Sequence, residues 1–293
     1  MLRLAFGTMA GLPDPLRWAE GADLARCRFG VDPEGAFKAV AGGQLVGSAF
    51  VVRWGGFAVF GPLSVRPDFW DRGVGSLLWE ACEAVVEHWG VGHVGLFTHP
   101  ESTKHVHLYR KHGFWPRFLV ALTEKQVAHG TGHAETFTSL DAAAGEQVLR
   151  ECAALTGTIH PGLDVSREIA SVTRQEIGDV VLVSDARGLA GFAVCHAGAG
   201  SETRAGTCYV KFAAARPGDA AAGRLRGLLD ACERFAAARD LTRMEVGVNL
   251  AREGAACVLE ERGYRTYRYG LAMNRPNVED VDRPDAFVLD DRR

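Results

Sequence analysis

Residues 65–78 read VRPDFWDRGVGSLL, and this stretch decides the fold of the chain. Its pattern is typical of a strand end, a glycine-bearing turn and the first turn of an amphipathic helix. Gly73 and Gly75 have no side chain to obstruct a ligand, and they tolerate the backbone angles of a tight loop. Exposed backbone N–H groups and the positive end of the helix dipole then converge on one point. The stretch therefore predicts a site for a phosphate or pyrophosphate.

The residues around this stretch predict a sheet whose strands are interrupted by two helices. From Val74 to Trp89, apolar residues recur at helical spacing, which predicts a helix with one face towards a core. The pair Gly42-Gly43 separates two apolar runs and indicates a hairpin. This arrangement is typical of an α/β or α+β fold, with a mixed, mostly antiparallel central sheet flanked by helices. The expected elements are strands 37–41, 45–53 and 57–65, helix 74–89, strand 93–98, helix 102–113 and strand 114–122.

The chain repeats itself at a spacing of 150 residues. Shifted by that amount without a gap, Arg66-Pro67 overlies Arg216-Pro217, and Gly73 overlies Gly223. Such a match predicts duplication of a whole domain, so the second copy is expected to repeat the order of elements. We predict a first domain at residues 1–125, a linker at 126–135, a second domain at 136–276 and a charged tail at 277–293.

The two copies differ at their beginnings. The second opens with an expected strand at residues 136–140, whereas the first opens at a point that aligns with a later helix. The first copy therefore lacks its first strand, or another segment of the chain takes that place. Residues 286–289 of the tail, which read AFVL, are one candidate for the substitute strand.

Composition excludes several classes of protein. The 293 residues carry a formal net charge of -3 at pH 7, without the basic stripe that marks general nucleic-acid binders. No apolar run approaches the roughly 18 residues of a membrane-spanning helix, and residues 1–7 do not resemble a secretory signal. Seven cysteines without C-x-x-C spacing indicate neither a disulfide framework nor a thiolate zinc site. We expect a cytoplasmic protein without nucleic-acid or membrane partners.

Taken together, these motifs resemble the GCN5-related N-acetyltransferase family. The resemblance rests on the order of elements, the loop at residues 67–75 and the run HLYRKHGF at 107–114. It covers the whole chain as a tandem pair of such domains, of which the second keeps only the scaffold. The family implies acetyl-CoA, or another acyl-CoA, as donor. It also implies that the amine of a small molecule or peptide attacks the thioester directly, and that no metal takes part.

The family's loop pattern, R/Q-x-x-G-x-G/A, aligns with residues 70–75. Trp70 stands where Arg or Gln is usual, and Arg72 can supply the missing charge. An ordinary turn between strand and helix is the alternative interpretation of this loop. The resemblance implies that the following residues cradle the pyrophosphate of acetyl-CoA: Arg72, Gly73, Val74, Gly75 and Ser76.

The strand before the loop contains Pro62, which cannot donate a hydrogen bond to a neighbouring strand and marks an edge, a bulge or a splay. Similar proteins splay their sheet at this point, and the pantetheine arm of the donor inserts there. Backbone N–H groups of Leu63, Ser64 and Val65 are therefore expected to bind the arm, and one can stabilise an oxyanion. A strand that simply ends early is the alternative.

Two side chains are candidates for proton transfer. Tyr109 matches the family tyrosine that protonates the departing thiolate. A base must also take a proton from the amine, and His99, Glu101, His105 and His107 are available. We choose His99 because it follows a strand, where the sites of α/β proteins usually lie. His105 and His107 diverge on a helix, so we expect no metal site there.

The second copy has lost the residues of the motif. Leu225 stands in place of the second glycine, and Leu259 in place of the tyrosine. We therefore predict one active site, in the N-terminal domain, and a non-catalytic second domain. One alternative is a non-catalytic acyl-CoA sensor or regulatory scaffold. Another is the transfer of a different acyl group to a small metabolite such as an amino sugar, an antibiotic or an amino acid.

Overall fold

The computed structural model describes residues 1–128, 130, 132–198 and 200–293. The expected linker at 126–135 includes residues 129 and 131, which lie outside the described residues. The strands are β1 (Ala36–Ala41), β2 (Gln44–Trp54), β3 (Phe57–Phe60), β4 (Ser64–Val65), β5 (His93–Thr98), β6 (Trp115–Gln126), β7 (Gly178–Asp185), β8 (Gly188–His196), β9 (Thr207–Ala215), β10 (Arg243–Asn249), β11 (Arg265–Arg275) and β12 (Val288–Leu289). The α-helices are α1 (Leu2–Met9), α2 (Leu24–Val31), α3 (Val74–His88), α4 (Thr103–Lys111), α5 (Ala142–Ile159), α6 (Ser166–Arg174), α7 (Ala221–Ala237) and α8 (Glu253–Glu261).

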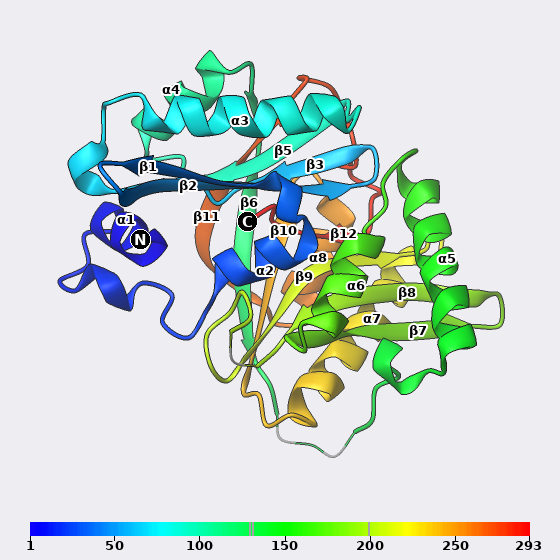
Figure 1. The fold of residues 1–293 in the computed structure, drawn as a ribbon. Helices are drawn as coiled ribbons and strands as arrows, with labels where there is room; N and C mark the ends of the chain where they lie inside the picture. The colour runs from blue at the N-terminus through cyan, green and yellow to red at the C-terminus, as the bar shows by residue number, and fades with distance from the viewer. Residues whose placement is uncertain (129, 131, 199) are drawn as a thin grey trace.

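These strands form one sheet that runs through both halves of the chain. Its order is β1-β2-β3-β5-β11-β6-β10-β9-β8-β7, with β4 beside β2 and β12 beside β9. The pairs β3–β5 and β9–β10 are parallel, and the other pairs are antiparallel. The predicted mixed, mostly antiparallel sheet with flanking helices is confirmed. Figure 1 shows α3 and α4 over the sheet of the first half, and α5 and α6 over that of the second.

The two halves exchange their last strands. By sequence β6 belongs to the first half, yet it lies between β11 and β10 of the second, while β11 lies between β5 and β6. Trp115 pairs with Asn274, and Glu124 pairs with Arg265. Under the 150-residue shift each of these pairs is the image of the other. The halves are therefore related by an approximate twofold axis, and neither half completes its sheet alone.

Helix α3 has the predicted apolar face, although Leu77 of the predicted stripe is exposed and Trp79, which lies outside that stripe, is buried. Its buried residues are Leu78, Trp79, Cys82 and Val86, which pack on the sheet of the first half. The equivalent helix α7 buries a larger apolar face against β7, β8 and β9. The two helices fix the position of the loop that precedes each of them.

The segment at residues 136–140, predicted as a strand, is not one. Only Thr136 forms an isolated bridge, to Val181, and Phe137–Ser139 is a short 3₁₀ helix. The backbone N–H and the hydroxyl of Thr138 both donate to the carboxylate of buried Asp179. This local hydrogen bonding competes with a strand and turns the chain.

The tail does not supply a first strand to the first half. Instead Val288 and Leu289 pair antiparallel with β9 of the second half. Among the described residues, no strand precedes β1. None of the helices that the structure describes is long and apolar enough to cross a membrane.

Candidate active site

The sheet of the first half opens next to Pro62, as the proline predicted. β3 and β5 pair only from Phe57 to Phe60, and after the cis peptide Gly61–Pro62 the chain turns to pair with β2. The N–H of Arg66 donates to the carbonyl of Val46 on β2. Because N–H directions alternate along an extended chain, the N–H of Val65 points the opposite way, into the gap towards β5.

A groove of about 600 Å³ starts at this gap and ends at the N-terminus of α3. Helices α1 and α4 close its sides. The structure brings most of the residues predicted to bind the donor into the groove: Leu63, Ser64, Val65, Gly73, Val74, Gly75 and Ser76.

The two glycines of the loop are needed for different reasons. Gly73 has a φ of 78°, a left-handed conformation that few other residues adopt readily. At Gly75 an added Cβ would lie 3.6 Å from Leu108 and 3.8 Å from Leu63, which are ordinary contacts. The protein itself therefore leaves room for a side chain at position 75. The space is left for a ligand that approaches the backbone, which fits a pyrophosphate at the start of α3.

The positive charge of the groove comes from a helix that sequence reasoning overlooked. Arg72 is not among the residues that line the groove, and its guanidinium lies 5.0 Å from the ring of Phe69. Lys104 and Lys111 of α4 line the groove instead, and Lys104 lies 2.7 Å from the carboxylate of Asp71, which also lines it. Trp70, in the place of the usual Arg or Gln, donates from Nε1 to the carbonyl of Val65 at 2.7 Å. Charges on an amphipathic helix normally indicate only a solvated face, so the lysines gave no separate signal.

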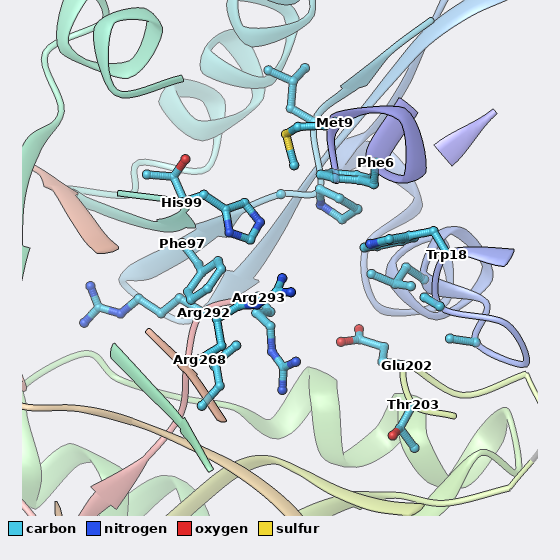
Figure 2. Close-up of a pocket in the computed structure, with 18 of the residues that line it drawn as sticks. Phe6, Met9, Trp18, Phe97, His99, Glu202, Thr203, Arg268, Arg292 and Arg293 are labelled. Atoms are coloured by element: carbon cyan, nitrogen blue, oxygen red, sulfur yellow. The ribbon is translucent and has the colours of Figure 1, made fainter. Parts of the chain in front are cut away.

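A second, inner cavity of about 340 Å³ adjoins the groove (Figure 2). The groove and the inner cavity share Phe6, Met9, Leu63 and His105. Both halves of the chain line the inner cavity. Its first-half residues include Phe97, His99 and Tyr109, and its second-half residues include Glu202, Thr203, Glu245, Tyr267, Arg268, Arg292 and Arg293. His99 and Tyr109, the two residues predicted to transfer protons, thus line the inner cavity and not the groove.

Tyr109 is held in place by aromatic packing. Its ring lies edge-on to Phe60 and Phe114, with 6.1 Å between centroids in each case. Burial raises the pKa of its phenol well above the ordinary value. Tyr109 therefore stays protonated near neutral pH and is able to donate a hydrogen bond or a proton.

Two histidines face the inner cavity in the neutral form. Burial lowers the pKa of His99 below its ordinary value of 6.5, although Glu101, 3.7 Å from its Nδ1, opposes the shift. Burial likewise lowers the pKa of His105, whose Nδ1 lies 2.6 Å from the hydroxyl of Ser102. His107 lines the groove rather than the inner cavity. A neutral imidazole has a free lone pair, so His99 and His105 both have the chemistry of a base.

In the second half the equivalent gap is filled by the tail. β9 and β10 pair only as far as Val210 with Val246. Beyond that point Val288 and Leu289 pair with Ala214 and Ala213, which are the repeat equivalents of Ser64 and Leu63.

The tail also forms the hydrogen bond that we expect of the pantetheine arm of a bound donor in the first half. The N–H of Ala215, the equivalent of Val65, donates to the carbonyl of Phe287 at 3.0 Å. β8 pairs with the opposite edge of β9, so the tail lies on the side of β9 that faces β10. The side chain of Asp291 lies against Gly247 of β10, where an added Cβ would be 2.3 Å from it. In the second half the tail therefore occupies the point where the first half opens into the groove.

The loop of the second half is closed as well. Helix α7 begins at Ala221, three residues earlier than α3 in the repeat. Leu225, in the place of Gly75, is completely buried, and the guanidinium of Arg224 donates to the carbonyls of Arg216 and Pro217. Side chains of the protein occupy the space that the first half leaves to a ligand.

Comparison with known proteins identifies the family. The acetyltransferase (GNAT) family profile matches residues 8–114, which include the loop and Tyr109. The chain therefore contains a GNAT-family domain. It is accordingly an acyltransferase, and acetyl-CoA is its co-substrate. The glycine loop, the gap and the groove in the first half fit such a donor. Within the described residues, no group of three or more His, Cys, Asp or Glu side chains is placed to hold a metal.

Solved structures show that both halves of the chain have the GNAT fold. A putative acetyltransferase from Pyrococcus horikoshii matches with a TM-score of 0.65 at 12% identity, covering 97% of this chain and 86% of its own. A GCN5-related N-acetyltransferase from Sphaerobacter thermophilus gives 0.58 at 18% identity, covering 96% and 92%. A tandem GNAT protein from the clavulanic acid pathway gives 0.51 at 13%, covering 90% and 94%. No curated protein gives a significant sequence match.

Proposed function

We propose that this protein is an acetyl-CoA-dependent N-acetyltransferase with a single active site, in its first half. The inner cavity holds the acceptor amine, which belongs to a small molecule or a peptide. The observation that supports this assignment is the difference between two equivalent gaps. The gap beside β4 leads into the open groove, whereas the gap beside β9 holds Val288 and Leu289.

The residues of the first half have distinct roles in this proposal. The N–H groups at the start of α3, together with Lys104 and Lys111, bind the pyrophosphate. Val65 donates its N–H to the arm, as Ala215 donates to Phe287 in the second half. The thioester then reaches the junction of groove and inner cavity.

Proton transfer is assigned to residues at that junction. His99 accepts the proton that the amine loses as its nitrogen bonds to the acetyl carbon and the C–S bond breaks. Tyr109 donates a proton to the departing thiolate. His105, which borders both cavities, is the second candidate for the base.

Calorimetric titration of acetyl-CoA tests the position of the site. Gly75→Leu gives the first half the residue that the second half has at Leu225. Loss of two charge-assisted hydrogen bonds weakens binding by about 100-fold or more. The matched control is Gly223→Ala, at a helical glycine whose added Cβ meets nothing within 4 Å. We expect one molecule bound per chain and unchanged affinity in the control.

Two results would contradict the proposal. One is binding of two molecules per chain, and the other is undiminished binding by the Gly75→Leu protein. Release of free CoA with a panel of amines then separates enzyme from sensor. Tight binding without CoA release for any amine would favour a non-catalytic acyl-CoA sensor.

A further inference from the structure

The charged side chains of the inner cavity show which acceptor it suits. Histidines aside, they are Glu202, Arg204, Glu245, Arg268, Arg292 and Arg293. All six come from the second half and its tail. Whether each already has a partner of opposite charge decides what the cavity offers to a ligand.

Four of the six are neutralised within the protein. Glu202 lies 2.9 Å from the guanidinium of buried Arg28 and 3.0 Å from the ammonium of buried Lys211. Glu245 lies 2.8 Å from Arg293. The guanidinium of Arg292 contacts two buried carboxylates, those of Asp280 and Asp282.

The remaining two, Arg204 and Arg268, have no ion pair or side-chain hydrogen bond among the described residues. The inner cavity therefore offers two unpaired guanidinium groups. Among the described residues that line it, every carboxylate already has a partner of opposite charge. A ligand with a negative group gains from this arrangement, whereas a polyamine would find no carboxylate to bind its additional ammonium groups.

Arg268 lies next to the candidate base. Figure 2 shows Arg268, Arg292 and Arg293 grouped beside Phe97 and His99. The charge of Arg268 is near enough to His99 to add to the lowering of its pKa. An anionic group bound by Arg268 and an amine near His99 can therefore belong to one small molecule in the inner cavity.

The opposite wall of the inner cavity is apolar. The rings of Phe6 and Trp18 stack there with 4.7 Å between centroids, beside Ala22 and Leu24. In Figure 2 these rings face the arginines across the cavity. This wall suits a hydrocarbon or aromatic side chain.

We propose that the acceptor is an amino acid with an apolar side chain, whose carboxylate is bound by Arg268. This proposal rests on the proposed function and names its substrate class. A guanidinium binds a carboxylate through two parallel N–H···O bonds, which orients the amine towards His99. The α-nitrogen bonds to the acetyl carbon, the thiolate leaves, and the amine's proton passes to His99.

Calorimetric titration of the full chain, saturated with CoA, tests this proposal. The probes are L-phenylalanine and L-leucine, their methyl esters, and the matching amines without a carboxylate, phenethylamine and isoamylamine. We expect the amino acids to bind about 10- to 100-fold more tightly than the esters and amines. Arg268→Gln should abolish this preference and leave the affinity of the amines that lack a carboxylate within about threefold.

The matched control is Arg265→Gln, on the same strand but outside the lining of the inner cavity. It should preserve the preference. The proposal is overturned if neither amino acid binds, if esters bind equally well, or if Arg268→Gln weakens every probe alike. Tighter binding of the phosphonate analogue of phenylalanine would assign the site to a phosphate group instead. Arg268-dependent binding without CoA release from acetyl-CoA would contradict the proposed function alone.

Discussion

Gly75 and Leu225 occupy equivalent positions and show how one residue decides what a loop binds. The surroundings of Gly75 leave room for a side chain, and in the proposed function a ligand takes this space. Leu225 uses the same space for the core of the second half. Burial acts in a similar way on the titratable groups. It keeps the phenol of Tyr109 protonated and the imidazoles of His99 and His105 neutral.

The pH dependence of kcat tests the assignment of the base. Because burial lowers the pKa of His99 below 6.5, its neutral form is present at neutral pH. Activity should therefore be maintained near neutral pH and fall as the pH drops through this lowered pKa. His99→Gln should lower kcat by about 10²- to 10⁴-fold and remove the acidic limb.

The parallel variant His105→Gln is the control for this experiment. The His105→Gln variant should keep the acidic limb of the pH profile and should lose less kcat than His99→Gln. If His99→Gln kept the pH profile of the wild-type protein and His105→Gln lost the acidic limb, the base would be assigned to His105 instead.

At the scale of elements, the C-terminal tail forms a short strand beside β9 in the second half. It takes the place that the arm of the donor is proposed to take in the first half. Val288 and Leu289 are fully buried, one in each of two core clusters. Buried Arg252 anchors the tail through Asp282 at 2.7 Å and Asp290 at 2.6 Å. These contacts hold the tail in the gap and bring Arg292 and Arg293 to the wall of the inner cavity.

Replacement of Leu289 by alanine measures how firmly the tail is held. Loss of a fully buried side chain should reduce the free energy of unfolding by about 2–5 kcal/mol. Val278→Ala, at an exposed position of the same tail, should change it by less than about 0.5 kcal/mol. Chemical denaturation measures both values. Equal stability of the two variants would show that the gap does not depend on the tail.

At the scale of the whole molecule, the exchange of β6 and β11 makes the halves interdependent. Every strand that pairs with β6 belongs to the second half, and β11 covers the edge of β5. The inner cavity lies across this junction, with its histidines on one side and its arginines on the other. In the proposed function, the second half therefore contributes residues to the acceptor cavity while the first half binds the donor.

Thermal unfolding tests this interdependence. We expect a single calorimetric transition whose van't Hoff and calorimetric enthalpies agree, because neither half completes its sheet alone. A fragment of residues 1–126 should show no cooperative transition. Two separate transitions in the full chain, or a stably folded fragment, would contradict the expected coupling.

Several features of the site were predicted from local sequence. The glycine loop, the apolar face of α3 and the interruption at Pro62 depend on residues close together in the chain, whose spacing carries the signal. Lys104 and Lys111 were missed because a charged helix face has no feature that separates ligand binding from solvation. Arg72 was expected in the groove, but its guanidinium lies over Phe69.

The sequence by itself determined that two similar α/β units follow each other and that only the first keeps a complete anion loop. Tertiary structure decided that β6 and β11 change places, that the tail fills the second gap, and that Arg268 and His99 line the same cavity. The physical reason is the nature of sheet pairing. A strand's alternating pattern fixes which face it buries, but not which free edge it joins. The partner is set by edges and cavities that form only when residues more than a hundred positions apart meet.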